Sequence, residues 1–370
     1  MNELFIKPEL QYFKTCKEFA DEFKPGKDDL VLTNQYIWEP FFGKLGLECR
    51  TVFQENFGKG EPTDEMFAAI YEAAGKGFKR VFGIGGGTVI DIAKVLALKD
   101  ASDLGALYDR PELVLRDKGL VLLPTTCGTG SEVTNISIFA LLKKNTKKGL
   151  TGKALFADYA CLVPELLQTI PDYVFATSSI DAMVHAIESS LSPKATGTTK
   201  LFGYKALDML LRGFKVISEK GMEARKPLMG DFLMASTYAG IAFGNAGCAA
   251  VHALSYPLGA AYHVAHGESN YAMFFGVMHS YLEIKSDGAI AELNKYMAGI
   301  IGCPPEKLYD CLEKILNSLI PRKPLREYGM KEADIDIFSD SVIANQQRLL
   351  ANNFVALDKD RIKKIYRDMY

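Results

Sequence analysis

The pattern of apolar and polar positions divides the chain into two parts. Up to about residue 165, short apolar runs alternate with helical patterns, and the runs that resemble strands are 28–34, 80–86, 119–126 and 154–164. Continuous apolar strands separated by helices are typical of a parallel sheet covered by helices on both faces. From about residue 170 the pattern changes to long helical stretches, such as 199–220 and 226–244, without a comparable series of strands.

This change of pattern predicts an α/β N-terminal domain with a parallel sheet and an all-α C-terminal domain. The 370 residues also favour two domains, because single hydrophobic cores stop growing near about 250–300 residues. Pro164 and Pro171 bracket the junction. We therefore expect one domain over 1–168 and a second over 169–370.

A glycine-rich turn joins the second predicted strand to the helix that follows it. The segment Gly83-x-Gly85-x-x-Thr88 is a near match to the dinucleotide-binding fingerprint, with threonine in place of the last glycine. Absent side chains let backbone N–H groups approach a phosphate at the helix N-terminus. A turn that only packs a helix closely on a strand would use the same residues, so both interpretations stay open.

A second polar turn follows the next predicted strand, in the segment 124–134. It carries four hydroxyl side chains, from Thr125, Thr126, Thr129 and Ser131. Ligands of open α/β sheets bind at the carboxyl ends of strands, so two such turns favour a nucleotide site more than one does. The alternative is a polar cluster that caps the next segment through Ser131 or Thr129.

All of the histidines lie in one quarter of the chain. They are His185, His252, His263, His266 and His279. Asp181 precedes the first by four residues in a predicted helix, so both side chains project from the same helix face. With His252 and His266 they form a mixed oxygen and nitrogen set, which suits Fe²⁺, Zn²⁺ or another first-row divalent ion better than Mg²⁺ or Ca²⁺. His263 and His279 are expected to take no part.

Two of the four proposed ligands, Asp181 and His185, also have simpler structural explanations. Ser178 and Asp181 together resemble a helix capping box. His185 has mostly apolar neighbours and could be a hydrogen-bonded histidine of the core. His252 is harder to explain in that way, because a buried imidazole among small apolar residues needs a polar partner.

Composition argues against a nucleic-acid-binding, membrane-bound or secreted protein. A net charge of −2 gives no electrostatic reason to expect nucleic acid or an anionic membrane surface as a partner. No apolar run approaches the roughly 20 residues of a membrane helix, and the N-terminus lacks the features of a signal peptide. The seven cysteines are odd in number and lack paired spacing, which indicates reduced thiols and a cytoplasmic protein.

Five motifs carry a resemblance to a known family. GGGTVID, TTCGTGSEVT, DAMVHAIE, VHALSYPLGAAYHVAHGE and NNF occur in the order seen in iron-containing (group III) alcohol dehydrogenases, over nearly the whole chain. The resemblance implies a dinucleotide-binding domain followed by a helical domain, Fe²⁺ or Zn²⁺ held by Asp181, His185, His252 and His266, and a homodimer or higher homo-oligomer. The cofactor residues that it implies, with Lys148 as an alternative to Lys147, are Asn34, Gly85, Gly86, Gly87, Thr88, Asp91, Thr125, Thr126, Thr129, Ser131 and Lys147.

Two positions depart from the family pattern. Many members have a histidine four residues after the third metal ligand, where this chain has Tyr256. Tyrosine can donate a hydrogen bond or relay a proton, but with an ordinary pKa of about 10 it is a poorer base; a packing role beside Pro257 is the alternative. Asn34 stands where members that prefer NAD often have aspartate, so NAD is expected while NADP stays open.

The resemblance implies reversible hydride transfer between a primary alcohol and NAD(P). The sequence as a whole is most similar to the members that interconvert 4-hydroxybutyrate and succinic semialdehyde; another short alcohol or diol is the alternative substrate. A carboxylate substrate requires a cation, and the candidates are Lys200, Arg212, Arg348 and Arg361. The rival hypotheses are a cyclase of the related dehydroquinate synthase branch, a metal-dependent hydrolase and a catalytically silent nucleotide-binding protein.

Overall fold

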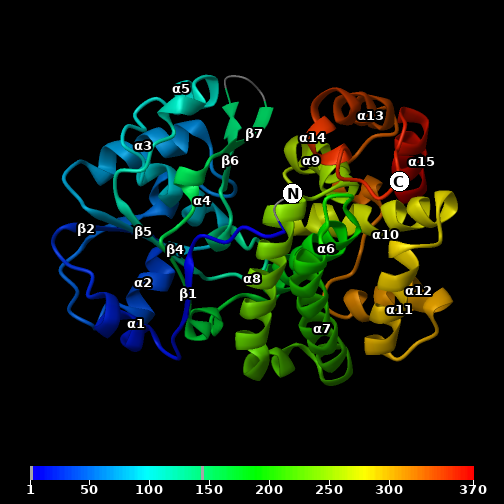
Figure 1. The fold of residues 1–370 in the computed structure, drawn as a ribbon, viewed down its shortest axis with the longest axis horizontal. Coiled ribbons are helices and arrows are strands. Elements are labelled where there is room, and N and C mark those ends of the chain that lie inside the picture. Colours follow the sequence, from blue (N-terminus) through cyan, green and yellow to red (C-terminus); the bar gives the residue numbers. More distant parts are fainter. Residues whose placement is uncertain (1–2, 143–145) are drawn as a thin grey trace. The chain divides into compact units, whose positions relative to one another are not determined.

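The computed structural model describes residues 3–142 and 146–370, which form two compact units. The first is an α/β unit, Ile6–Ile170, and the second is a helical unit, Pro171–Tyr370, which also includes residues 3–5 (Figure 1). The division falls after Ile170, two residues beyond the boundary that we expected from the sequence.

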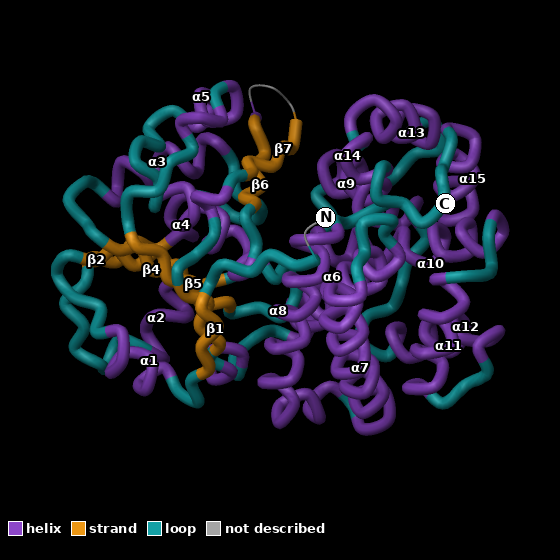
Figure 2. The backbone as a smooth tube through the Cα atoms, in the orientation of Figure 1, coloured by secondary structure: helices purple, strands orange, loops and turns teal. Residues whose placement is uncertain are grey.

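The α/β unit is built on a six-stranded parallel sheet (Figure 2). Its strands are β1 (Glu9–Tyr12), β2 (Asp29–Thr33), β3 (Arg50–Phe53), β4 (Arg80–Gly85), β5 (Gly119–Pro124) and β8 (Tyr159–Leu162), in the order β1-β8-β5-β4-β2-β3. The predicted strands near 28–34, 80–86, 119–126 and 154–164 are confirmed as β2, β4, β5 and β8. The two edge strands, β1 and β3, were not predicted.

Helices cover both faces of this sheet. They are α1 (Cys16–Phe23), α2 (Gln35–Phe41), α3 (Asp64–Ala74), α4 (Gly87–Leu96) and α5 (Leu104–Asp109), with the short 3-10 segments η1 (Gln54–Phe57), η2 (Pro111–Leu113), η3 (Ser131–Val133), η5 (Lys153–Leu155) and η6 (Pro164–Leu167). Successive residues of β4 show the two faces. Phe82 packs edge-to-face on Phe19 and Phe23 of α1, whereas Gly83 lies against Ala93 of α4. A parallel sheet buried on both faces explains why its central strands read as continuous apolar runs.

The strand order also locates a topological switch point. The chain runs from β2 outward to β3 and then returns to the other side of β2 to form β4. Ligands of open α/β sheets bind at the carboxyl ends of the strands where the order reverses in this way. Asn34 follows β2 and Gly86 follows β4, so the switch point brings these two predicted cofactor residues to one edge of the sheet.

A separate antiparallel hairpin consists of β6 (Ile136–Leu141) and β7 (Thr146–Thr151). Residues of β6 alternate between buried and half-buried, as expected for a strand with one face on the core. The hairpin was not predicted, although Phe139 and Leu150 belong to the same core as α3 and α4.

The second unit is entirely helical over the described residues, as we predicted. Its helices are α6 (Asp172–Leu191), α7 (Gly197–Lys220), α8 (Met229–Ala246), α9 (Ala250–Tyr262), α10 (His266–Ile284), α11 (Ala289–Ile301), α12 (Leu308–Asn317), α13 (Asp334–Asn345), α14 (Gln347–Leu350) and α15 (Lys359–Met369), with 3-10 segments η7 (Met222–Leu228), η8 (Pro305–Lys307) and η9 (Leu325–Tyr328). α6 packs against α7, α8 and α10 and is buried over most of its length. Among the described residues, no helix has the length and apolar character needed to cross a bilayer.

Candidate functional site

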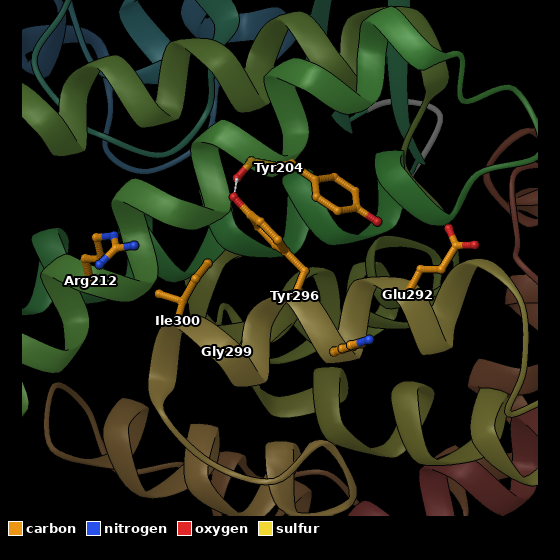
Figure 3. Close-up of a pocket in the computed structure, with 7 residues that line it drawn as sticks. Tyr204, Arg212, Glu292, Tyr296, Gly299 and Ile300 are labelled. Carbon is orange, nitrogen blue, oxygen red and sulfur yellow. Dashed lines mark hydrogen bonds between the residues drawn. The ribbon is translucent and has the colours of Figure 1, made fainter.

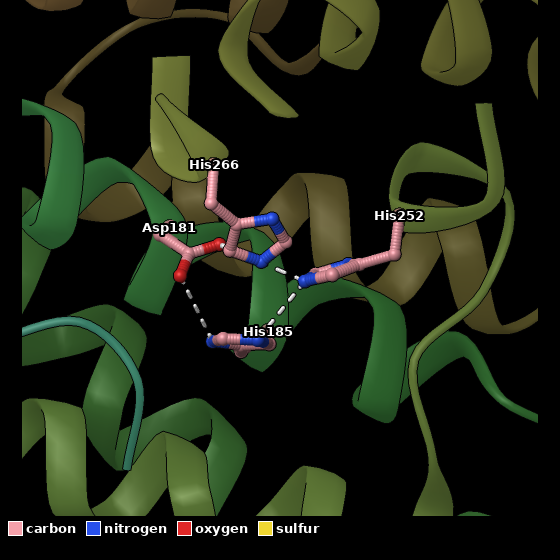
Figure 4. Close-up of side chains that lie close together, drawn as sticks. All are labelled: Asp181, His185, His252 and His266. Carbon is pink, nitrogen blue, oxygen red and sulfur yellow. Dashed lines mark hydrogen bonds and ion pairs between the residues drawn. The ribbon is translucent and has the colours of Figure 1, made fainter. Parts of the chain in front are cut away.

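The helix α6 places Asp181 and His185 on one face, as their spacing predicts. The capping-box interpretation of Asp181 is wrong, because α6 begins at Asp172 after Pro171, and Ser178 lies inside the helix. Both Asp181 and His185 are buried. The Nδ1 atom of His185 lies 3.9 Å from Oδ2 of Asp181 (Figure 4).

Two other helices bring the remaining imidazoles to the same point. His252 lies in the first turn of α9, and His266 begins α10. The Nε2 atoms of His252 and His266 lie 3.6 Å and 3.8 Å from Oδ1 of Asp181, and the Nε2 atoms of His185 and His252 are 2.9 Å apart. The four side chains converge from three helices (Figure 4), and one donor atom from each lies within 4.8 Å of all the others.

The chemistry of this cluster fits a divalent first-row ion. One carboxylate and three imidazoles are the ligand types that iron(II) and zinc prefer. Burial alone would raise the pKa of Asp181, but the surrounding imidazoles hold it well below its usual range, so the carboxyl is ionised. Burial opposes protonation of His252, yet the carboxylates of Glu188 and Asp181 raise its pKa to about 9. A bound cation would displace that proton.

Asn270 supports the cluster and was not predicted. It lies one turn after His266 in α10 and is buried. Its Nδ2 atom donates to Oδ1 of Asp181 over 2.7 Å and lies 3.3 Å from Nε2 of His266, while its Oδ1 accepts from the hydroxyl of Ser255. The i, i+4 spacing from His266 is the signal in the sequence that could have identified it.

Gly267 allows α10 to approach α6 closely beside the cluster. A β-carbon at this position would lie 2.1 Å from the carbonyl oxygen of Thr177 and 3.3 Å from Cβ of Asp181. A side chain here would therefore force apart the helices that carry Asp181 and His266.

We expect Gly267→Ala to lower the free energy of unfolding by about 1–3 kcal/mol, as overpacking does, and to weaken metal binding. Thermal unfolding with and without added Zn²⁺ measures both effects. Gly299→Ala in α11 is the matched control, because no atom lies near its new β-carbon and alanine favours a helix. A Gly267→Ala protein as stable as this control, with undiminished zinc binding, contradicts the expectation.

The other singled-out residues of the helical unit lie as follows. The ring of Tyr256, one turn after His252 in α9, is 6.0 Å from the ring of His266 between centroids. His263 ends α9 in the left-handed conformation and is exposed, and His279 is an exposed residue of α10. Neither belongs to the four-residue cluster.

In the α/β unit, the two polar turns are in contact. α4 begins at Gly87, and its N-cap residue, Gly86, provides no side-chain cap. A β-carbon on Gly86 would lie 3.4 Å from Cγ2 of Thr126, and one on Gly87 would lie 3.0 Å from Cγ2 of Thr129. Gly85 is closely packed as well, since a β-carbon there would collide with Val89. The glycines thus allow α4 to pack closely on the strand before it and on the hydroxyl-rich turn.

Hydrogen bonds within the protein hold several of the predicted cofactor residues. The Thr88 hydroxyl donates to the carbonyl of Gly60 over 2.8 Å, and the N–H of Thr125 donates to the carbonyl of Gly85 over 3.0 Å. Lys147 contacts Glu61 through its ammonium group over 2.7 Å.

A buried ionic network joins α4 to the second turn. Oδ1 of Asp91 accepts from the Ser131 hydroxyl over 2.6 Å, and its Oδ2 accepts from the N–H of Ile138 over 2.8 Å. Lys94, which is fully buried, donates to the Ser131 hydroxyl over 2.6 Å and lies 3.7 Å from Oδ1 of Asp91. The hydrogen bond between Asp91 and Ser131 therefore connects α4 to the second turn and holds that turn in position.

Glu55 is a further residue of this edge that the sequence did not indicate. The side chain of Asn34 is buried and donates from Nδ2 to Oε2 of Glu55 over 2.9 Å and to Gln54 over 3.2 Å. Oε1 of Glu55 also accepts from the N–H of Gln35 over 2.6 Å. A carboxylate is thus present at the end of β2 although Asn34 itself is neutral.

A groove of about 580 Å³ lies elsewhere in the helical unit, where α7 faces α11 (Figure 3). Tyr204 and Arg212 come from α7, and Glu292, Lys295 and Tyr296 come from α11. The groove shares no residue with the histidine cluster, so it is not the candidate metal centre.

Two family models match the chain, in the order of its two units. The model described as iron-containing alcohol dehydrogenase matches residues 11–164, and the C-terminal model of the Fe-containing alcohol dehydrogenase family matches residues 175–370. The chain belongs to the iron-containing alcohol dehydrogenase family. The resemblance found in the five motifs is thereby confirmed, and the fold is that of this family.

Individual relatives agree with this assignment. The chain is 46% identical to the 4-hydroxybutyrate dehydrogenase of Clostridium kluyveri, and the match covers 100% of both chains. Two solved structures share the fold: an alcohol dehydrogenase from Oenococcus oeni (TM-score 0.84, 18% identity, 100% of both chains) and a sulfoacetaldehyde reductase from Bifidobacterium kashiwanohense in complex with NAD⁺ (TM-score 0.83, 21% identity, 100% of this chain and 98% of the other).

Proposed function

We propose that this protein is a metal- and NAD-dependent dehydrogenase that interconverts 4-hydroxybutyrate and succinic semialdehyde. The observation that carries the proposal is the convergence of Asp181 and three histidines in a chain that is 46% identical, over its full length, to a 4-hydroxybutyrate dehydrogenase. Succinic semialdehyde and 4-hydroxybutyrate differ by two electrons and two protons, so the reaction moves a hydride and a proton.

In this proposal Asp181, His185, His252 and His266 hold an iron(II) or zinc ion. Such an ion, when bound, acts as a Lewis acid on the oxygen of the alcohol or aldehyde. Asn270 keeps the Asp181 carboxylate in position through its 2.7 Å hydrogen bond. The ring of Tyr256 lies 6.0 Å from that of His266 between centroids, and its hydroxyl would hold or pass on the proton of the alcohol.

The nucleotide is assigned to the α/β unit. The uncapped first turn of α4, with Gly85, Gly86, Gly87 and Thr88, would receive the pyrophosphate, because helix N-termini attract anions. The hydroxyl-rich turn touches these glycines and would line the same site with its four predicted residues, Thr125, Thr126, Thr129 and Ser131. Asp91 would act on the nucleotide indirectly, by holding this turn in position. Lys147 would supply a positive charge near the nucleotide.

NAD is preferred over NADP because of Glu55. Its carboxylate is bonded to Asn34 at the end of β2, where the ribose of a dinucleotide lies in this class of fold. A carboxylate there accepts hydrogen bonds from ribose hydroxyls and repels a 2′-phosphate. The neutral Asn34 therefore does not remove the selectivity that an aspartate would provide.

Arg348 is our candidate partner for the substrate carboxylate. Of the four cations considered from the sequence, Arg212 pairs with Asp208 and Arg361 pairs with Glu283. Arg348 is exposed in α14 and makes no hydrogen bond or ion pair through its side chain with any described residue. The side chain of Asn352 donates to the carbonyls of both Arg348 and Cys248. These hydrogen bonds connect the backbone of Arg348 to Cys248, whose thiol lies near His252. Lys200 lacks such a link.

Arg348→Gln is expected to lower kcat/KM for succinic semialdehyde by about 10–100-fold, because a charge-assisted hydrogen bond contributes about 1.5–3 kcal/mol. The variant should turn over the neutral four-carbon aldehyde butanal as the wild type does. Arg361→Gln, which removes a cation already paired, is the matched control. Equal losses with both aldehydes would contradict a role in carboxylate binding.

The function itself is tested by a direct assay. Protein purified anaerobically and loaded with Fe²⁺ or Zn²⁺ is mixed with NADH or NADPH, and cofactor oxidation is followed with succinic semialdehyde and with neutral aldehydes. We expect the fastest turnover with NADH and succinic semialdehyde. No turnover with any aldehyde, despite bound metal and cofactor, would contradict the dehydrogenase assignment.

We also propose a homodimer or higher homo-oligomer and a cytoplasmic location, and we expect no nucleic-acid partner. All seven cysteines are free thiols, which supports a reducing compartment. Sedimentation of the purified protein tests the oligomeric state.

A further inference from the structure

A third acidic residue of α6, Glu188, contacts His252 on the side of its ring that faces away from the other three ligand candidates. Glu188 follows His185 by three residues and Asp181 by seven, so all three side chains share one helix face. Its side chain is 0% exposed. Oε2 of Glu188 lies 2.6 Å from Nδ1 of His252, the ring nitrogen opposite the one that faces Asp181 and His185.

Glu188 also caps the helix that carries His252. Ala249, at the N-cap position of α9, has no side chain that could cap, and the N–H groups of Ala249 and Val251 donate instead to the two Glu188 oxygens over 2.9 Å and 2.6 Å. The start of α9 is therefore bonded directly to α6. Because His252 lies in that first turn, its position relative to Asp181 and His185 depends on Glu188.

The contact also determines which nitrogen of His252 is available. Both oxygens of Glu188 accept hydrogen bonds from backbone N–H groups, so we infer that Nδ1 of His252 is also a donor in its contact with Oε2. In a neutral ring the lone pair is then on Nε2, which points toward the other ligands. The opposite tautomer would direct an N–H into the cluster, and that proton would have to leave before a cation could bind.

Charge balance supports the same conclusion. Asp181 and Glu188 are both buried, and neither contacts a lysine or arginine among the described residues. Once a bound cation has displaced the extra proton of His252, no protonated imidazole remains to balance these two side chains, and a divalent ion would take over that role.

We propose that Glu188 is the positioning residue of the metal centre: its hydrogen bonds to His252 and to the start of α9 fix the tautomer and orientation of His252. This inference rests on the proposed function in that it takes the cluster to be a metal site. Groups that hold a metal-ligating histidine in this way typically affect metal affinity by about 10–100-fold.

Glu188→Gln tests the proposal without changing the shape of the side chain. Wherever the amide nitrogen is placed, it opposes either the N–H of Val251 or those of Ala249 and His252, so one donor always faces another. We expect the affinity for Zn²⁺ alone, measured by competition with a chromophoric chelator, to fall by about 10–100-fold. Unchanged affinity would overturn the proposal.

Cys248→Ser is the matched control. The thiol of Cys248 is buried, and with Glu188 and His252 it forms a second group whose ligand atoms lie within 4.8 Å of one another. We expect this variant to keep its zinc affinity. A loss as large as that of Glu188→Gln would instead identify the thiol as a ligand, with His252 turned to bind through Nδ1, and would overturn the positioning role.

A measurement on the wild-type protein covers the case in which Glu188→Gln does not fold. With ¹⁵N-labelled histidine, the five imidazoles of the zinc-loaded protein report which ring nitrogen carries the proton. We expect His252, assigned by through-bond correlation to its own backbone, to be protonated on Nδ1; a proton on Nε2 overturns the proposal. Neither measurement needs substrate or cofactor, so a failed aldehyde assay leaves the result valid.

Discussion

Replacing Lys94 by methionine is expected to lower the free energy of unfolding of the α/β unit by about 3–5 kcal/mol, the usual cost of removing one partner of a buried ion pair. Lys94 is 0% exposed, and its ammonium group donates to Ser131, to Thr134 and to the carbonyl of Ile136. Methionine fills similar space but leaves Asp91 without its nearby cation and these acceptors without their donor.

The single tryptophan allows this loss of unfolding free energy to be measured for the α/β unit specifically. Trp38 lies in α2 and stacks on Phe42 within the α/β unit, so its fluorescence during urea unfolding reports on that unit alone. Lys17→Met, in an exposed i, i+4 pair with Asp21, is the control and should change stability by no more than about 0.5 kcal/mol. If Lys94→Met changes the unfolding free energy as little as this control does, the network of Asp91, Lys94 and Ser131 does not stabilise the hydroxyl-rich turn.

The same network predicts a dependence on pH. Burial lowers the pKa of Lys94 to about 8, although the Asp91 carboxylate opposes this shift, whereas a lysine of the unfolded chain titrates near about 10.4. Between these values the unfolded chain binds more protons, so the contribution of Lys94 to stability rises with pH. The difference in unfolding free energy between the wild type and Lys94→Met should therefore widen from pH 8 to about pH 10; a constant difference would contradict the assignment.

Asp181→Asn is expected to abolish stable metal binding and to lower kcat by about a thousand-fold. Asp181 is the one anionic donor among the four ligand candidates, and an amide neither carries its charge nor binds a first-row cation as strongly. A Lewis acid contributes several kcal/mol of transition-state stabilisation, and about 4 kcal/mol corresponds to a thousand-fold in rate.

Metal analysis, aldehyde reduction and thermal unfolding check this expectation together. Added Zn²⁺ should raise the Tm of the wild type, because a ligand that binds only the folded state stabilises it, and should leave the Tm of Asp181→Asn unchanged. Asp231→Asn, an exposed carboxylate of α8 in the same unit, is the control. Full metal occupancy in Asp181→Asn would remove Asp181 from the ligand set.

The sequence predicted the parts of the fold whose burial is uniform. β2, β4 and β5 are buried along almost their whole length, and their continuous apolar runs were recognised. β1 is an edge strand with largely exposed residues, and β3 has four residues of mixed burial, so neither forms an apolar run. The hairpin β6–β7 was missed because a strand pairing depends on contacts that the local pattern does not contain.

For the candidate site as well, the sequence predicted what depends on local spacing and not what depends on tertiary packing. Helical spacing predicts that Asp181 and His185 share a face, but the approach of His252 and His266 from other helices follows from tertiary packing. Glu188 was overlooked, although its spacing from both α6 residues is visible in the sequence. Glu55 could not be found in this way, because its contact with Asn34 joins the ends of two strands, and nothing local to residue 55 indicates it.

The short helix α14 has a consequence for redesign. Its backbone is fastened by the buried side chain of Asn352, while Arg348 projects from it at the surface without an ionic partner among the described residues. Exchanging such an exposed side chain usually changes stability by no more than about 0.5 kcal/mol. Under the proposed role of Arg348, new aldehyde specificities could be screened at this one position without compensating mutations in the core, whereas changes at Lys94 are expected to lower stability and changes at Glu188 to weaken metal binding.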